Sequence, residues 1–332
     1  MTAPLETSGS TDAAPEAIVS SASSGQIEGR SLGRIAWTRL RRDKAAMAGG
    51  VVVVVLIVLA ILAKPIQWVF GLDPNELHQD LIDPALATPY GPFGGVSAEH
   101  WLGVEPKLGR DIGTRILEGS WVSLLVAFGS TMLAVVIGTV MGVIAGYYGG
   151  WADTVISRMM DTFLAFPLLL FAISISAALQ GGAFGLEGLP LHISVLIFVI
   201  GFFSWPYIGR IVRGQTLSLK EREFVEAARS LGARGPYILF RELLPNLAGP
   251  ILVYATLLIP TNILFEASLS FLGVGIQPPQ ASWGGMLSDA VEYYQVDPMY
   301  MVVPGMAIFL SVLAFNLLGD GLRDALDPKS RR

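Results

Sequence analysis

The sequence contains no cysteine, which excludes disulfides, thiolate metal sites and cysteine nucleophiles. It has three histidines, His78, His100 and His192, and none of them belongs to an HExxH metal-binding pair. None of the five lysines follows a glycine, so the chain has no P-loop for ATP. We therefore expect that the protein is not an enzyme and that this chain itself binds no cofactor or metal.

Charged residues are also scarce, at 15% of the chain, whereas soluble domains typically contain about 25%. Six stretches without Asp, Glu, Lys or Arg approach or exceed the length of about 20 residues that a helix needs to cross the hydrocarbon core. They are residues 45–63, 119–152, 162–186, 188–209, 243–265 and 298–319. One such stretch alone is compatible with a buried core helix. Six in series predict an all-α integral membrane protein with six transmembrane helices.

A seventh uncharged stretch, residues 267–288, differs from the other six because it is rich in glycine and proline. It includes Gly273, Gly275, Pro278 and Pro279. Such a segment would leave backbone N–H and C=O groups without partners in lipid. We therefore interpret it as an external loop that partly re-enters the protein.

Basic residues indicate the orientation, because cytoplasmic loops collect Lys and Arg. With the N-terminus inside, 18 of the 22 basic residues face the cytoplasm. Only Lys64, Lys107, Arg110 and Arg115 lie outside, where the loops carry twelve acidic residues. Both termini of this multi-pass protein are therefore predicted to be cytoplasmic. No basic groove with aromatic platforms is present, so nucleic acid is not an expected partner.

These patterns divide the chain into segments. We predict a disordered cytoplasmic tail (1–29), a basic interfacial helix (30–44), a first transmembrane helix (45–70), an external loop (71–118), a five-helix core (119–322) with a cytoplasmic loop (210–246), and a second cytoplasmic tail (323–332). A solvated basic tail that only fixes the topology is the alternative for residues 30–44.

The cytoplasmic loop has its own helix pattern. Ser218 and Glu221 have the SxxE spacing of a capping box, which predicts a helix start, and Gly232 predicts its end. Phe224, Ala228 and Leu231 recur at i, i+4 and i+7 and form a narrow apolar stripe. A second short helix is expected over residues 237–244. The stripe indicates a partner surface, and packing on the chain's own transmembrane helices is the alternative.

Residues 226–232 of this loop read EAARSLG, and LPN follows at 244–246. This pattern resembles the EAA loop of permeases in bacterial binding-protein-dependent ABC importers. The resemblance implies a coupling helix that docks in a groove of the ATP-hydrolysing subunit. The docking residues that it implies are Phe224, Glu226, Ala227, Ala228, Leu231, Gly232 and Pro245.

Further segments resemble the oligopeptide, dipeptide and nickel branch of that family, and in particular its C-type subunit. They are HWLG at 100–103, GYYGGW at 146–151, AFP at 165–167, EASLSFLG at 266–273 and AFNLLGDGLRDALDP at 314–328. The sequence departs from the family pattern at two places. Residues 104–107 (VEPK) make the spacing after HWLG one residue longer than usual. Glu242 and Leu243 occupy positions where the family often has His.

The resemblance implies a type I ABC importer permease fold in the bacterial inner membrane. It implies as partners a second homologous permease, two ATP-binding subunits that hold ATP and magnesium, an external substrate-binding protein and a peptide cargo. Nickel chelates or glutathione are alternative cargoes in the same class. A secondary transporter or channel that works without ATPase subunits is the alternative from a different class.

Charged groups near the transmembrane helices are the remaining candidates, because charge in a membrane is costly. Asp161 is expected to pair with Arg158 one helical turn away as an inner clamp. Glu266 is expected near the outer end of the fifth helix, where it could face the translocation path. A bond to the Ser268 or Ser270 region or to a partner helix is the alternative. Gln277 lies in an irregular segment that could form part of a gate.

Overall fold

Helices account for the regular structure of the described residues, which in this computed structural model are 32–91, 93–179, 182 and 185–326. The only β pairing within them consists of two isolated bridges, Ile82 with Pro89 and Val104 with Asp111. The N-terminal tail expected over residues 1–29 and the last six residues of the C-terminal tail lie outside the described residues.

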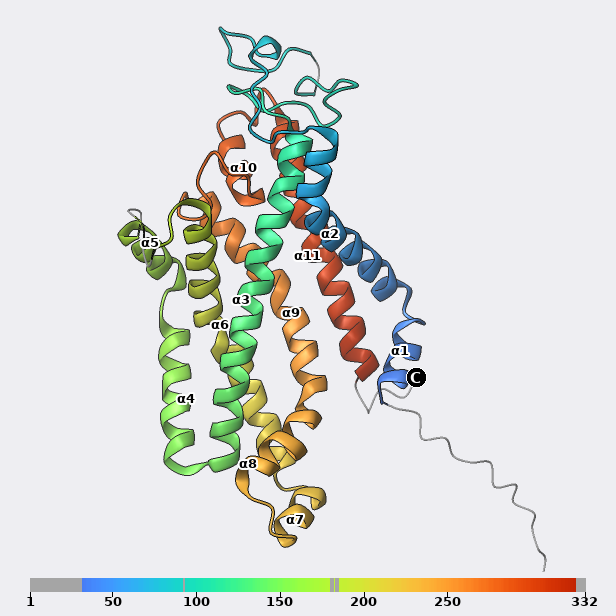
Figure 1. Cartoon of the computed structure of the whole chain (residues 1–332), viewed down its shortest axis with the longest axis vertical. Helices are drawn as coiled ribbons and strands as arrows, with labels where there is room; N and C mark the ends of the chain where they lie inside the picture. The colour runs from blue at the N-terminus through green and yellow to red at the C-terminus, as the bar shows by residue number, and fades with distance from the viewer. Residues whose placement is uncertain (1–31, 92, 180–181, 183–184, 327–332) are drawn as a thin grey trace, which may run out of the picture.

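Five helices are long and apolar enough to cross a membrane, and a bent helix pair forms a sixth crossing if it is counted as one (Figure 1). The five are α2 (Lys44–Phe70), α3 (Ile112–Tyr148), α6 (Gly188–Leu219), α11 (Pro298–Leu326) and the continuous helix Gly235–Phe271, which consists of α8 (Gly235–Tyr237), the π-helix η2 (Ile238–Leu243) and α9 (Leu244–Phe271). The all-helical membrane fold is therefore confirmed. The separate short helix expected over residues 237–244 was wrong, because η2 runs directly into α9.

The single transmembrane helix expected over residues 162–186 is instead part of a bent helix pair. The pair consists of α4 (Gly150–Ala165) and α5 (Leu168–Ala178), which meet at an angle of 80°. Phe166 between them is extended, as a residue before proline prefers to be, and Pro167 cannot donate a backbone hydrogen bond to continue the helix. The chain turns into α4 at Gly149, whose φ of 67° suits glycine.

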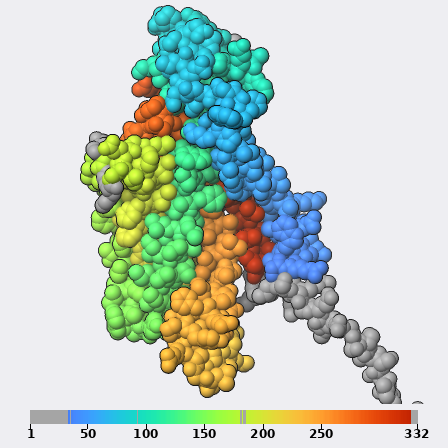
Figure 2. Space-filling model, in the orientation of Figure 1, coloured from blue at the N-terminus to red at the C-terminus, as the bar shows by residue number. Residues whose placement is uncertain are grey.

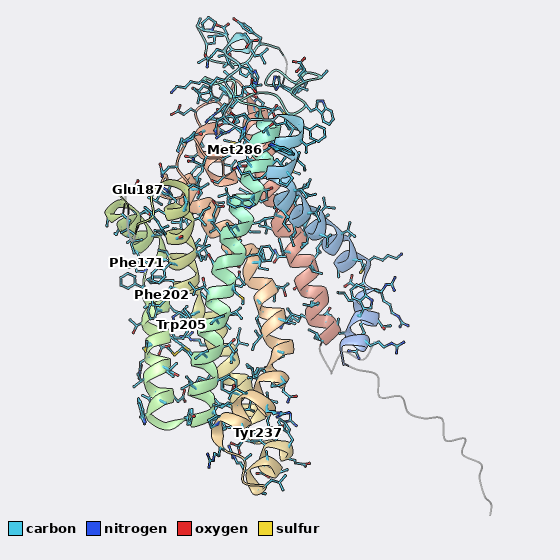
Figure 3. The ribbon with its side chains drawn as sticks, in the orientation of Figure 1. Phe171, Glu187, Phe202, Trp205, Tyr237 and Met286 are labelled. Carbon is cyan, nitrogen blue, oxygen red and sulfur yellow. The ribbon has the colours of Figure 1, made fainter. Side chains whose placement is uncertain are left out.

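Glycines bring α3 and α6 into close contact, and these two helices share the most extensive interface among the described elements. Gly138, Gly142 and Gly146 lie on one face of α3, four residues apart, against α6. A Cβ on Gly142 would lie 2.6 Å from the carbonyl oxygen of Gly209. Small residues at this spacing let helix backbones approach closely in membranes. Figure 3 shows Trp205 of α6, which is almost fully buried, at the level of this interface.

The two ends of the helix bundle differ. One end carries α7 (Glu223–Ser230), and the other is covered by residues 71–111, here called the cap, with the short helix η1 (Gln79–Leu81) (Figures 1 and 2). The cap is shorter than the predicted loop of residues 71–118 because Asp111 caps α3 by accepting a hydrogen bond from the backbone N–H of Thr114 at 2.6 Å.

Two further boundaries differ from expectation. α9 continues to Phe271, and α10 (Trp283–Ala290) forms a helix capped by Ser282, so residues 267–288 are only in part the irregular loop that we expected. α10 packs against α9 and α11, which agrees with the predicted re-entry. The basic helix is α1 (Leu32–Leu40), and its Leu40 packs with Ala46 and with Ala325 of α11.

Candidate functional site

The α7 loop connects α6 to the continuous helix Gly235–Phe271 and contains the residues with the strongest family resemblance. α6 extends to Leu219, and α7 begins only at Glu223, with Arg222 at the capping position. The capping-box prediction for Ser218 and Glu221 was therefore wrong, because Ser218 still belongs to the preceding helix. The local SxxE pattern did not start a helix here, because the packing of the long helix α6 extends that helix through Ser218.

The predicted end of α7 at Gly232 is confirmed. Gly232 has a φ of 83°, in the left-handed region. The N–H of Ala233 donates to the carbonyl of Ala228 at 3.0 Å, and the N–H of Gly232 donates to that of Arg229 at 2.9 Å. These two bonds form a Schellman motif, which satisfies the carbonyls at a helix end. The turn thus fixes the direction in which the loop leaves α7.

Three contacts attach the loop to the body of the protein. Val225 is completely buried in a cluster with Ile238 and Leu243. The guanidinium of Arg229 lies 5.8 Å from the ring centre of Tyr147 at the end of α3, which is within cation–π range. Lys220 donates to the carbonyl oxygen of Gly146 at 3.0 Å. The loop is therefore held on the ends of α3 and the continuous helix.

The opposite face of α7 is open. Leu231 is 88% exposed and Phe224 is 36% exposed, and Glu226, Ala227 and Gly232 are also exposed. A hollow of about 630 Å³ lies between α7 and the helix that follows it. We call it the α7 hollow. Its lining is Phe224, Ala227, Ala228, Leu231, Gly232, Ala233, Arg234, Tyr237 and Glu242. Figure 3 shows Tyr237 at this end of the molecule.

Of the seven predicted docking residues, five line the α7 hollow, whereas Glu226 and Pro245 do not, and their docking role stays a prediction. Ala228 is partly buried and packs against the chain's own cluster, so it contributes to both surfaces. Pro245 lies in the first turn of α9, exposed, and does not line the α7 hollow. Val225, which the sequence pattern did not single out, is the side chain that faces inward.

Two ion pairs join α4 to α6. Arg213 donates to both carboxylate oxygens of Asp153, from Nε to Oδ1 and from Nη2 to Oδ2, the second at 2.7 Å. Arg210 pairs with Asp161 at 2.6 Å, whereas the predicted partner Arg158 is 4.0 Å away. The clamp at Asp161 is thus mainly a bond between helices. The sequence suggested the nearer arginine, because contacts across helices cannot be read from local spacing.

The pathway role of Glu266 and Gln277 stays a prediction, and the structure shows the bonds that each residue makes within this chain. Glu266 is fully buried, and Ser270 donates to its Oε1 at 2.8 Å, which is the bond weighed as the alternative to a pathway role. Gln277 donates to the carbonyl oxygen of Gly273 at 2.7 Å and so folds back on its own segment. Both bonds lie within the segment where α9 leads toward α10, and the second carboxylate oxygen of Glu266 is buried without a partner among the described residues.

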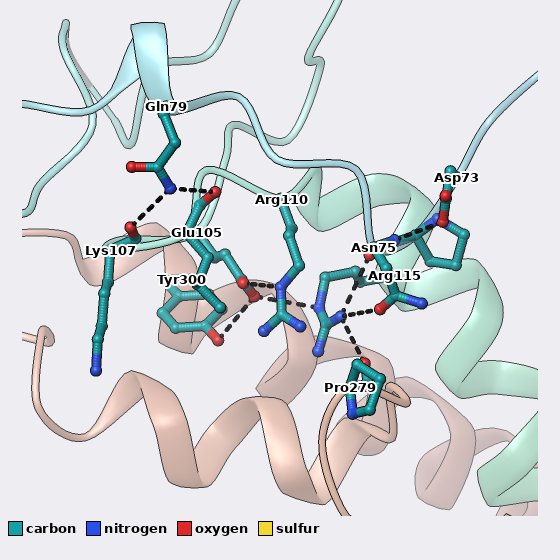
Figure 4. Close-up of polar contacts among 11 residues, drawn as sticks. Asp73, Asn75, Gln79, Glu105, Lys107, Arg110, Arg115, Pro279 and Tyr300 are labelled. Atoms are coloured by element: carbon teal, nitrogen blue, oxygen red, sulfur yellow. Dashed lines mark hydrogen bonds and ion pairs between the residues drawn. The ribbon is translucent and has the colours of Figure 1, made fainter.

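The cap contains a buried charged network that the sequence did not predict (Figure 4). Glu105 accepts hydrogen bonds from Arg110 Nε and from Tyr300 Oη, the latter at 3.2 Å, and forms an ion pair with Arg115 Nε at 3.1 Å. All four residues are at most 5% exposed. Glu105 belongs to the segment with the extra residue, and that departure from family spacing was the signal that could have been followed.

These features define a class of protein. Several apolar helices cross a membrane, and a polar loop at one end presents an apolar hollow that suits a second protein. The class is a multi-pass helical membrane protein with an open apolar hollow at one end.

Comparison with known families identifies the group within that class. The profile of the family described as "Binding-protein-dependent transport system inner membrane component" matches residues 138–332, and that of the "N-terminal TM domain of oligopeptide transport permease C" matches residues 31–89. The chain belongs to the family of binding-protein-dependent inner-membrane transport components. It is a multi-pass permease subunit of an ABC importer, so the alternative of an independent secondary transporter or channel is excluded.

The relatives are similar along most of their length. The glutathione transport system permease protein GsiD of Pectobacterium atrosepticum is 42% identical over 88% of this chain and 90% of the relative. GsiD of Escherichia coli is 44% identical over 88% of this chain and 89% of the relative. A solved structure of the MetNI methionine ABC transporter in inward-facing conformations aligns with 64% of this chain and 96% of its own, at 21% identity and a TM-score of 0.49.

Proposed function

We propose that this permease subunit receives the energy of ATP hydrolysis through the exposed face of α7 and imports short peptides. Two ATP-binding subunits hold ATP and magnesium, a second homologous permease completes the translocation path, and an external binding protein delivers the cargo. Both termini lie in the cytoplasm, on the same side as α7.

The observation that carries this proposal is the exposure of Leu231. The side chain of Leu231 is 88% exposed, so in the isolated chain most of its apolar surface remains in contact with water. Burying such a side chain in a partner is worth about 1.5–3 kcal/mol. The adjoining α7 hollow, lined by Phe224 and Ala227 among others, extends this surface to the size of a docking site.

The attachment of the loop supports a role in force transmission. A displacement of α7 on docking is transmitted to α3 through the contact of Arg229 with Tyr147. It is transmitted to the continuous helix through the packing of Val225 with Ile238. The Schellman motif at Gly232 restricts the loop to one exit direction. A docking event at α7 is therefore passed on to two membrane helices rather than absorbed by a loose connection.

The similarity to GsiD proteins supports the cargo class. At 42% and 44% identity over 88% of the chain, these permeases are named for the transport of glutathione, which is itself a tripeptide. Short peptides, glutathione among them, are accordingly the cargo that we propose.

Coupling is tested by replacing Leu231 with Asp. A carboxylate at the centre of the docking surface loses the apolar contact and adds a desolvation cost, so binding of the ATPase should fall at least about tenfold. The measurements are the amount of ATPase that copurifies with the permease pair, and ATP hydrolysis stimulated by loaded binding protein in reconstituted vesicles.

The matched control is Leu86 to Asp, which places the same charge on a 70% exposed leucine in the cap, at the other end of the molecule. This variant should retain wild-type ATPase binding. Equal ATPase binding and stimulation in Leu231→Asp and wild type would disprove coupling through α7.

A further inference from the structure

The cap end of the molecule, opposite α7, has a hollow of about 630 Å³ that we call the cap hollow. Its walls come from residues 105–110 of the cap, from Pro278 and Pro279, and from α10 and the segment that leads to α11. The lining residues are Glu105, Pro106, Lys107, Leu108, Arg110, Pro278, Pro279, Ser288, Asp289, Glu292, Tyr293 and Tyr300. This volume lies within the range of about 300–1,000 Å³ that is typical of small-molecule sites.

Arg110 presents unused hydrogen-bond donors at this hollow. The residue is only 5% exposed, and its Nε donates to Glu105. No described residue accepts a hydrogen bond from its two terminal nitrogens, which Figure 4 shows without a partner. A guanidinium binds a carboxylate through two parallel N–H bonds, so these nitrogens form a ready site for a carboxylate.

The charge of the buried network favours an anion there. One carboxylate, Glu105, is shared between the guanidinium groups of Arg110 and Arg115. Arg115 also donates to the neutral carbonyl oxygens of Pro74 and Pro279, each at 3.2 Å. Within this network of three side chains the positive charge exceeds the negative by one, and Lys107 adds a positive charge at the rim, while Asp289 and Glu292 of the facing wall balance the hollow as a whole. A carboxylate placed directly on Arg110 is therefore favoured on this side of the hollow, because charges interact more strongly in a partly desolvated site.

The other wall of the cap hollow is acidic. Asp289 and Glu292 both line it. Desolvation raises the pKa of Asp289 above its ordinary value, and Arg115 and Arg110 oppose this shift. The cap hollow thus has a cationic side and an anionic side. A short peptide with free ends carries the complementary pair of charges.

We propose that the cap hollow binds the zwitterionic backbone of a short peptide, with the terminal carboxylate on the free nitrogens of Arg110 and the terminal ammonium near Asp289 and Glu292. This inference rests on the proposed peptide cargo. It adds a second contact for the peptide, on the permease itself, between its release by the binding protein and its entry among the helices.

The test uses the assembled complex of both permeases and both ATPases in lipid nanodiscs, without ATP and without binding protein. Saturation-transfer NMR measures the affinity of alanyl-alanine, of its C-terminal amide and of its N-acetyl form. The amide lacks the carboxylate and should bind at least about tenfold more weakly, because a charge-assisted bidentate bond is lost. The N-acetyl form, which lacks the ammonium, should bind several-fold more weakly.

Variants locate the site. Arg110→Lys keeps a positive charge beside Glu105 but loses the planar fork, so alanyl-alanine binding should fall about tenfold. Glu292→Gln should weaken alanyl-alanine binding several-fold and leave that of the N-acetyl form unchanged. The matched control is Glu99→Gln, which neutralises another exposed glutamate of the same end outside the cap hollow and should have no effect. Thermal unfolding verifies that each variant is folded.

Equal binding of alanyl-alanine and its amide, or wild-type affinity in folded Arg110→Lys and Glu292→Gln, would overturn the proposal. A separate measurement adds the binding protein to the same complex. If Arg110→Lys weakens its docking but not the binding of alanyl-alanine, the carboxylate partner is a protein side chain and the proposal is also overturned. ATP-driven peptide uptake by wild type is measured in parallel. If uptake is normal and no peptide binds the hollow, this inference fails alone, whereas absence of peptide uptake refutes the proposed cargo.

Discussion

Replacement of Gly142 by Ala tests the close packing of α3 on α6. The added Cβ would lie 2.6 Å from the carbonyl oxygen of Gly209, 2.9 Å from Cβ of Val212 and 3.0 Å from the backbone nitrogen of Arg213. Ordinary contacts begin at 3.4 Å. Two of these three neighbours are backbone atoms, which cannot rotate away, so the helices must separate by most of an ångström.

The expected magnitude follows from two opposing effects. Overpacking of this kind costs about 1–3 kcal/mol. Alanine regains about 0.5–1 kcal/mol relative to glycine within a helix. The net loss of about 0–2.5 kcal/mol corresponds to a fall in Tm of up to about 4 °C for a chain of 332 residues, because its unfolding entropy is about 0.7 kcal/mol/K. The assay is thermal unfolding of the purified complex, followed by fluorescence-detected size-exclusion chromatography.

Gly214→Ala is the matched control. Gly214 lies in α6 with nothing within 4 Å of an added Cβ, so only the gain in helix propensity applies and Tm should stay or rise slightly. If Gly142→Ala raises Tm as Gly214→Ala does, α3 and α6 are not in contact through their glycines, and the reasoning is refuted.

Three further outcomes are expected. Gly232→Val opposes the left-handed turn that ends α7, at a cost of about 1–2 kcal/mol, and should reduce stimulated ATP hydrolysis without loss of membrane insertion; wild-type stimulation would contradict this. Glu266→Gln keeps an acceptor for Ser270 and should leave peptide uptake near wild type, whereas a large fall in uptake would support the pathway role. In this cysteine-free chain, Ser230→Cys should react with a membrane-impermeant thiol reagent only after cell lysis and Glu99→Cys in intact spheroplasts; the reverse would invert the proposed orientation.

The number and approximate position of the membrane helices could be predicted from the sequence because uncharged length is itself the physical requirement of the bilayer. The length of uncharged stretches did not predict where the backbone bends, because bends depend on individual residues. The 80° bend at Phe166 and Pro167 lies inside a run that composition alone shows as continuous. Gly149 starts α4 well before the predicted crossing, since amphipathic character did not enter a search for uncharged runs.

For the candidate site, the exposed face of α7 was predictable and its attachment was not. Leu231 and Phe224 followed from helical spacing, and Gly232 from its conformational freedom. The contacts of Arg229 with Tyr147 and of Arg210 with Asp161 join residues distant in sequence, which no local pattern reveals. The same applies to Glu105, whose partner Tyr300 lies 195 residues away.

The continuous helix Gly235–Phe271 connects the two ends of the molecule, so a tilt at one end would move the other end as a lever does. Its 37 residues correspond to a rod of about 55 Å. A rotation of about 5° around its midpoint would move each tip by about 2.4 Å on that length, in opposite directions. One tip adjoins α7, and the other leads to the segment of Gln277 and Pro278 beside the cap hollow. Pro250, Pro260 and the π-helical turn η2 are the places where this helix can bend. The stiffness at these places determines how much of a displacement at one end reaches the other.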